Sequence, residues 1–147
     1  MSLLDRLSND MKLAMKAQDK TRLSVIRMVL SAVKYVEIEK KASLTDDQVL
    51  DVLAREVKQR KDSLAEFERG NRKDLVAKVK EELAILADYL PEQLSEEAVR
   101  EVITAVIKEV GATGKADMGR VMGAVMPQLK GRADGKLINT IVQELLL

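Results

Sequence analysis

Apolar residues recur every three or four positions along almost the whole chain. The clearest run is Leu75, Val79, Leu83, Leu86 and Leu90. This spacing places the side chains on one face of an α-helix, whereas a half-buried strand would alternate with period two. Aromatic residues make up only 2% of the chain, so any core must consist of Leu, Val, Ile, Met and Ala. The pattern predicts an all-α protein.

Capping residues and helix breakers divide this pattern into seven helices. Ser2 with Asp5 and Thr45 with Gln48 resemble capping boxes, while Ser95, Asp117 and Asp134 are expected to cap later helices. Glycine suits the left-handed position after a helix, so the third helix is expected to stop near Gly70. The second helix, from about residue 19 to 41, is apolar on more than one face. That breadth predicts the central helix of a bundle.

The sequence PEQL, residues 91–94, is the expected boundary between two units. We expect an N-terminal helical domain of about four helices at residues 1–90, and a C-terminal three-helix domain at residues 95–147. With 147 residues the chain can hold one domain or two small ones, at roughly 100–200 residues per domain.

Most catalytic and metal chemistry is excluded by residue type. The chain has no cysteine and no histidine, so it offers neither a thiolate nucleophile nor an imidazole base. Adjacent carboxylates such as Glu81 and Glu82 do not face each other on a helix. We therefore predict no catalytic residue, no metal and no cofactor, and no catalysis by this chain alone. No signal peptide or membrane span is recognisable, which favours a soluble cytoplasmic protein.

Basic residues form two groups although the net charge is only +1. Acidic residues interleave the first group, between Arg55 and Lys73, which indicates a solvated face. Within it, Arg60 lies beside the apolar stripe of its helix and is expected to extend along its own stem to solvent. Five basic residues against two acidic ones make the second group more one-sided, and we consider it a candidate RNA-binding patch: Lys115, Arg120, Lys130, Arg132 and Lys136.

The predicted sixth helix contains residues that weaken helices. Its methionines and valines form the expected buried face, and Gly119, Gly123 and Pro127 form a row on one flank. Interior glycine costs about 1 kcal/mol relative to alanine. Gly119 and Gly123, continued by Gly131 at the following turn, would let another backbone approach closely. Two explanations stay open: helix packing within the small unit, or a partner such as RNA lying against the flank.

At these residues the chain resembles a known family. The segment KADMGRVMGAVMPQLKGRADGKLINTIVQELL, residues 115–146, is similar to the YqeY family, and the junction LPEQL, residues 90–94, fits it too. That family is related to the tail of the B subunit of the glutamine-dependent tRNA amidotransferases. The resemblance to the amidotransferase covers chiefly residues 95–147.

The resemblance implies an N-terminal helical unit, a three-helix tail-like unit and an association with tRNA. In the amidotransferase the tail helps to hold tRNA while catalysis occurs elsewhere, so a label of carbon–nitrogen ligase with glutamine as donor would be inherited from the related subunit. The implied partners are tRNA and an amidotransferase or tRNA-charging enzyme.

Three functions therefore stand open. The first is a non-catalytic tRNA-associated binding module. The second is an accessory component of a glutamine-dependent amidotransferase, and the third is a helical protein-interaction scaffold. With so few aromatic residues, an RNA partner would be recognised by shape and backbone rather than by base stacking.

Overall fold

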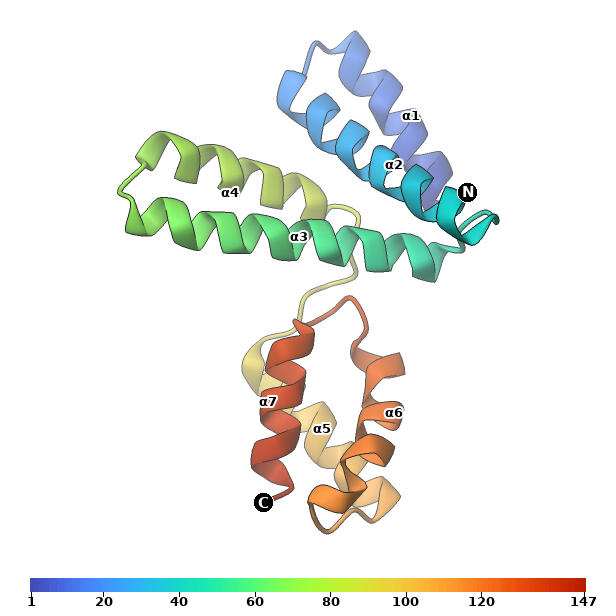
Figure 1. The fold of residues 1–147 in the computed structure, drawn as a ribbon, viewed down its shortest axis with the longest axis vertical. Helices are drawn as coiled ribbons and strands as arrows, with labels where there is room; N and C mark the ends of the chain where they lie inside the picture. The colour runs from blue at the N-terminus through green and yellow to red at the C-terminus, as the bar shows by residue number, and fades with distance from the viewer. The chain divides into compact units, whose positions relative to one another are not determined.

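The computed structural model describes all 147 residues and is entirely helical, which confirms the predicted fold class (Figure 1). The chain separates into two compact units, Met1–Leu90 and Pro91–Leu147. Each unit has its own cluster of buried aliphatic side chains. No helix is long and apolar enough to cross a membrane.

The N-terminal unit consists of two helical hairpins. Its helices are α1 (Leu3–Lys16), α2 (Lys20–Lys40), α3 (Asp46–Arg69) and α4 (Lys73–Ala87). Helix α2 packs against the other three helices, and its core residues include Ile26 and Val29, which are fully buried. Both predicted capping boxes are confirmed, at Ser2 with Asp5 and at Thr45 with Gln48. Local hydrogen bonds to free N–H groups therefore fix where α1 and α3 begin.

Helix α3 ends at Arg69, directly before Gly70 as predicted, but the left-handed position was assigned to the wrong residue. Gly70 has an ordinary negative φ of −80°, and the left-handed residue is Asn71 with φ 55°. Asparagine tolerates this conformation better than most residues other than glycine. The turn between α3 and α4 therefore depends on Asn71, and Gly70 needs no special conformation.

Arg60 is buried, contrary to the prediction that it reaches solvent. Only 7% of the residue is exposed. Its guanidinium pairs with Glu56 of the same helix at 2.6 Å and approaches Glu82 of α4 at 3.9 Å. A second guanidinium nitrogen lies 3.4 Å from the sulfur of Met28 on α2. Both carboxylates stabilise the cation inside the unit. The i,i+4 spacing to Glu56 can be read from the sequence, whereas the approach of Glu82 and Met28 cannot.

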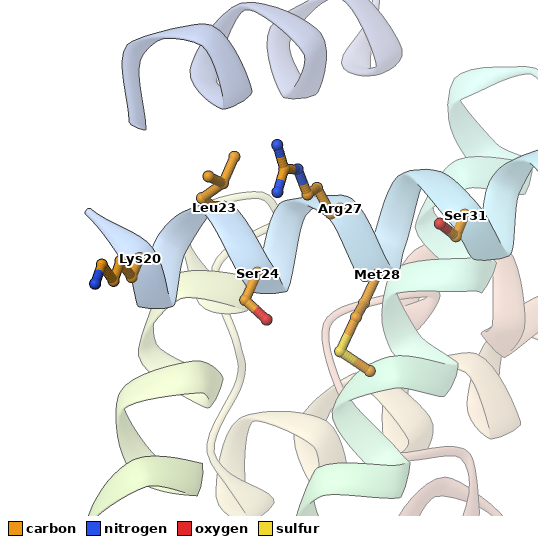
Figure 2. A pocket seen from close by; sticks show the side chains of 6 residues that line it. All are labelled: Lys20, Leu23, Ser24, Arg27, Met28 and Ser31. Carbon is orange, nitrogen blue, oxygen red and sulfur yellow. The ribbon is translucent and has the colours of Figure 1, made fainter. Parts of the chain in front are cut away.

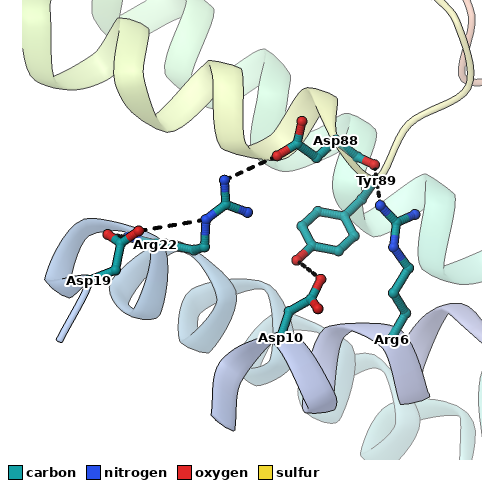
Figure 3. Close-up of polar contacts among 6 residues, drawn as sticks. All are labelled: Arg6, Asp10, Asp19, Arg22, Asp88 and Tyr89. Carbon is teal, nitrogen blue, oxygen red and sulfur yellow. Dashed lines mark hydrogen bonds and ion pairs between the residues drawn. The ribbon is translucent and has the colours of Figure 1, made fainter. Parts of the chain in front are cut away.

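The end of α4 is attached to the first hairpin by Tyr89. This tyrosine is buried, its hydroxyl donates to the Asp10 carboxylate, and the Arg6 guanidinium lies 4.7 Å from its ring centroid (Figure 3). Arg6 also donates to the Asp88 carbonyl at 2.7 Å. Burial, and then the hydrogen bond to Asp10, raises the pKa of Tyr89 to about 12.

A second arginine joins α2 to the same end of α4. Arg22 pairs with the Asp88 carboxylate at 3.1 Å and with Asp19 at 3.7 Å (Figure 3). Burial alone would lower the pKa of Arg22, but the hydrogen bond and charge of Asp88 raise it. The last residues before the boundary between the units are thus held by both helices of the first hairpin.

The C-terminal unit is a three-helix bundle with one short 3₁₀ helix. Its elements are α5 (Glu96–Val110), η1 (Lys115–Asp117), α6 (Met118–Leu129) and α7 (Gly135–Leu145). Residues 91–94 belong to it because they bond to the α6–α7 turn: Leu94 N–H donates to the Arg132 carbonyl at 2.9 Å, and Gln93 donates to the Gly131 carbonyl at 2.6 Å. The unit therefore begins four residues before the predicted position.

Candidate nucleic-acid interface

Helix α6 presents one strongly buried face. Val121, Val125 and Leu129 are fully buried, and the methionines beside them are partly buried against the same core. Pro127 lies inside the helix, which continues to Leu129. The proline bears no N–H, so one backbone hydrogen bond near the end of the helix is absent. The predicted Met/Val face is therefore the side by which α6 packs on α5 and α7.

The glycine row lies on the other side and is exposed. A Cβ atom built on Gly119 or Gly123 would meet no atom within 4 Å. Pro127 is exposed as well. The explanation that Gly119 and Gly123 allow close helix packing inside the unit is therefore wrong. The row forms a strip of α6 surface without large side chains, which we call the bare strip, consisting of Gly119, Gly123 and Pro127.

Glycine at position 131 is required by the backbone conformation and not by the close approach of another chain segment. Its φ of +75° lies in the left-handed region, and an added Cβ would stand 3.6 Å from Pro91, an ordinary contact distance. Glycine adopts this conformation without the strain that a side chain would cause. Gly131 therefore shapes the α6–α7 turn and its bond to Gln93.

Two of the predicted cations stand at the start of α6. Lys115 is exposed, while Arg120 pairs with Asp117 at 3.2 Å. Asp117 was expected to cap α6, but its carboxylate instead accepts from Thr113 N–H at 2.9 Å. This hydrogen bond, followed by the charge of Arg120, holds the pKa of Asp117 below its usual value. Asp117 therefore partly neutralises the charge of Arg120, which makes Lys115 the stronger cation for a phosphate at this end of α6.

The other three cations stand at the turn after α6. Lys130 and Arg132 are half-buried, and the Arg132 Nε donates to the Glu92 carbonyl at 3.4 Å. Lys136 is exposed in the first turn of α7, where Asp134 accepts from its backbone N–H as predicted. Arg132 thus helps to hold the start of the unit, while the Lys136 side chain projects into solvent.

The predicted patch is therefore two groups of cations at opposite ends of α6. From residue 120 to residue 130 a helix rises about 15 Å, at 1.5 Å per residue. The bare strip lies along the same helix between the two ends. The sequence prediction grouped all five cations by their nearness along the chain and did not apply the helix rise, which already separates Lys115 and Arg120 from the other three.

Sequence reasoning also missed a hollow beside Lys115. Its volume is about 400 Å³, and it is lined by Lys115, Met118, Thr140, Gln143, Glu144 and Leu147. Half of these residues, Thr140, Gln143 and Glu144, belong to α7, which the apolar pattern marks only as a core helix. No signal in the sequence joins the last turn of α7 to the start of α6.

The chain is thus an all-helical protein of two units, and α6 in the second unit carries an exposed bare strip with cations at both ends. The family model described as Yqey-like protein matches residues 4–146. The chain belongs to the YqeY family, as its C-terminal segment suggested.

Curated relatives support this membership. A protein of Pyrenophora tritici-repentis is 30% identical over 147 residues, which cover 98% of this chain and 81% of the relative. A protein of Saccharomyces cerevisiae strain YJM789 is 34% identical over 127 residues, 81% of this chain and 68% of the relative. A Kluyveromyces lactis protein is 48% identical over 84 residues, 56% of this chain and 45% of the relative.

The names of these relatives overturn one prediction. All three are called "Altered inheritance of mitochondria protein 41, mitochondrial". The prediction of a cytoplasmic protein is therefore contradicted, because the relatives' names point to mitochondria. Their names mention neither tRNA nor an amidotransferase.

Proposed function

We propose that the C-terminal unit is a non-catalytic module that binds tRNA through its sugar–phosphate backbone. The observation that carries the proposal is the exposed bare strip of α6 with a group of cations at each end. A helix surface without large side chains allows a bulky polyanion to approach closely, and lysine and arginine then neutralise phosphates.

The composition of the unit supports recognition of the backbone rather than the bases. Residues 91–147 contain no Phe, Tyr or Trp, so no aromatic ring is available to stack on a base. Single-stranded RNA is usually read by such stacking, whereas structured RNA is read by shape and by phosphate and 2′-OH contacts. A folded RNA such as tRNA fits this surface better than an unpaired strand.

The test measures tRNA binding by filter retention across a salt series. The variant Lys115→Glu/Lys136→Glu reverses one exposed cation at each end of α6, and Arg132 stays unchanged because it contacts the Glu92 carbonyl. We expect weaker binding and a salt slope reduced by about 1.5, at 0.7–0.9 per lost phosphate contact.

The matched control is Lys73→Glu/Lys78→Glu on α4. It changes two exposed lysines and the same net charge, but in the N-terminal unit. We expect tRNA affinity and salt slope near those of the unaltered protein. If both double variants lose affinity equally, binding reflects overall charge and the proposed interface is refuted.

A further inference from the structure

Helix α2 is more apolar than its place in the fold requires. Its buried residues, Val25, Ile26, Val29 and Val33, lie on one side. The opposite side carries Met28, Tyr35 and Ile38, whose exposed fractions are 49%, 65% and 67%. A helix that is apolar on several sides is normally buried on all of them. Within the N-terminal unit, only the sulfur of Met28 on this side is in contact with another helix, through Arg60 of α3, and Tyr35 and Ile38 stay exposed.

The exposed side has the spacing of a helix-pairing surface. Met28 and Tyr35 stand seven residues apart, and Ser24, Ser31 and Ile38 form a second row with the same interval. Alternating steps of three and four residues are the a and d positions of a coiled-coil seam. We call these five residues the α2 seam.

A hollow lies along the first half of the α2 seam. Its volume is about 440 Å³, and α2 alone lines it, through Lys20, Leu23, Ser24, Arg27, Met28 and Ser31 (Figure 2). Leu23 and Arg27 point to one side of the helix, and Ser24 and Met28 to the other. The small serines leave room between these longer side chains, so the knobs of a second helix could enter there.

One edge of the α2 seam is uniformly basic. Lys20, Arg27 and Lys34 repeat at seven-residue intervals and are exposed. No ion pair of the N-terminal unit includes any of them. In a coiled coil the residues that flank the seam choose the partner by their charge. The charge that matches this edge is negative.

A second copy of this chain does not supply that charge. An antiparallel copy would place the basic edge against itself, because equivalent flanks meet in that arrangement. A parallel copy would bring the opposite edge, where Val25 and Ala32 carry no charge and Glu39 is the only carboxylate at the matching seven-residue interval. Exposed Met28 and Ile38 also favour a protein over RNA, since apolar side chains gain little beside phosphates.

We propose that the α2 seam binds an amphipathic helix of another protein whose apolar stripe is flanked by Asp and Glu. Met28, Tyr35 and Ile38 supply the apolar contact, and tyrosine and methionine are enriched at such interfaces. Lys20, Arg27 and Lys34 pair with carboxylates along the partner. This inference does not rest on the tRNA proposal, which concerns the other unit.

The test uses two synthetic helical peptides of four heptads with leucine at the seam positions. One carries Glu and the other Lys at both flanking positions, and like charges keep each peptide from pairing with itself. Binding to the full chain is measured by fluorescence anisotropy. We expect about fivefold tighter binding of the Glu peptide, as for three exposed ion pairs. Equal binding of both peptides, or of neither, overturns the proposal.

Two variants test whether the preference for the Glu peptide arises at α2. Arg27→Glu/Lys34→Glu should reverse the order, so that the Lys peptide binds more tightly, while the control Lys73→Glu/Lys78→Glu should leave the preference unchanged. All four positions are exposed, so the folded structure should persist and is checked by circular dichroism. Loss of preference in both variants would indicate an unspecific charge effect and overturn the proposal.

Binding of a second copy of the chain, or of RNA, to the α2 seam would also overturn the proposal. Sedimentation of the unaltered chain would show self-association if a second copy covered the α2 seam, and Tyr35→Glu would then abolish the dimer. A tRNA titration would lose affinity in Arg27→Glu/Lys34→Glu if RNA were the ligand of this face. We expect a monomer in the first measurement and unchanged tRNA affinity in the second.

Discussion

Replacing Gly119 and Gly123 by alanine tests whether the bare strip is open to solvent, as the structure shows it. Neither glycine has a positive φ, and an added Cβ would meet no atom within 4 Å. Alanine therefore only removes the unfavourable backbone entropy of glycine. Gly123, in the helix interior, contributes about 1 kcal/mol. Gly119, in the first turn, contributes about half as much.

The double variant should therefore stabilise the C-terminal unit by about 1.5 kcal/mol. For a unit of this size, 1 kcal/mol shifts the melting temperature by about 4–8 °C, so the expected rise is about 6–12 °C. Thermal unfolding of the full chain measures it, and hydrogen exchange of residues 118–129 assigns it to α6. A lower melting temperature would mean that these glycines are needed for packing, and would refute the open geometry of the strip.

A second pair of substitutions tests the function of the same surface. Gly119→Gln/Gly123→Gln keeps residues that favour helices but fills the bare strip with long side chains. We expect stability at or above that of the unaltered protein and tRNA affinity lower by about tenfold, which corresponds to about 1.4 kcal/mol. Unchanged tRNA affinity in a folded variant would mean that RNA does not approach α6 at the strip.

The N-terminal unit and the loop before α6 give further predictions. Arg60→Met should lower the free energy of unfolding in urea by about 3 kcal/mol, because Glu56 loses its buried partner. Tyr89→Phe should cost about 1–2 kcal/mol at pH 7 by leaving the Asp10 carboxylate unpaired. The pKa of Tyr89 is raised from 10.0 to about 12, so the stability that the protonated hydroxyl gives the fold is complete below pH 10 and is lost as the pH rises to 12. Tyr89→Phe should not show this loss of stability. The pKa of Asp117 is lowered from 3.8, so the stabilisation that its carboxylate provides is present above that pH and is lost on further acidification. In an acid unfolding series, Asp117→Asn should remove this pH dependence of stability.

The helices and their caps could be predicted because the forces behind them are local. The capping box of Thr45 with Gln48 needs only two residues three positions apart, and the structure contains both of its hydrogen bonds. The apolar period likewise depends only on neighbours within two turns. Asn71 was missed because Gly70 stands directly before it and glycine is the commoner left-handed residue.

The burial of Arg60 could not be predicted because, apart from Glu56 on its own helix, the groups around it come from other helices. Glu82 on α4 and Met28 on α2 approach it only after the two hairpins pack together. The same limit applies to the bare strip. The sequence marks Gly119 and Gly123 as one row of α6, but whether that row faces a neighbour or solvent depends on where α5 and α7 lie.

The prediction that α2 is the central helix of a bundle was only partly correct. Its several apolar sides predicted a central bundle helix, and α2 does contact the three other helices of its unit. Yet those helices bury the side of Ile26 and Val29 and reach the opposite side only at the Met28 sulfur, while Tyr35 and Ile38 stay exposed. Isolated exposed apolar residues are common on protein surfaces, but a set at heptad spacing with a basic edge is not explained by the fold of the unit. The discrepancy between pattern and burial is therefore the strongest reason to examine α2 for a protein partner.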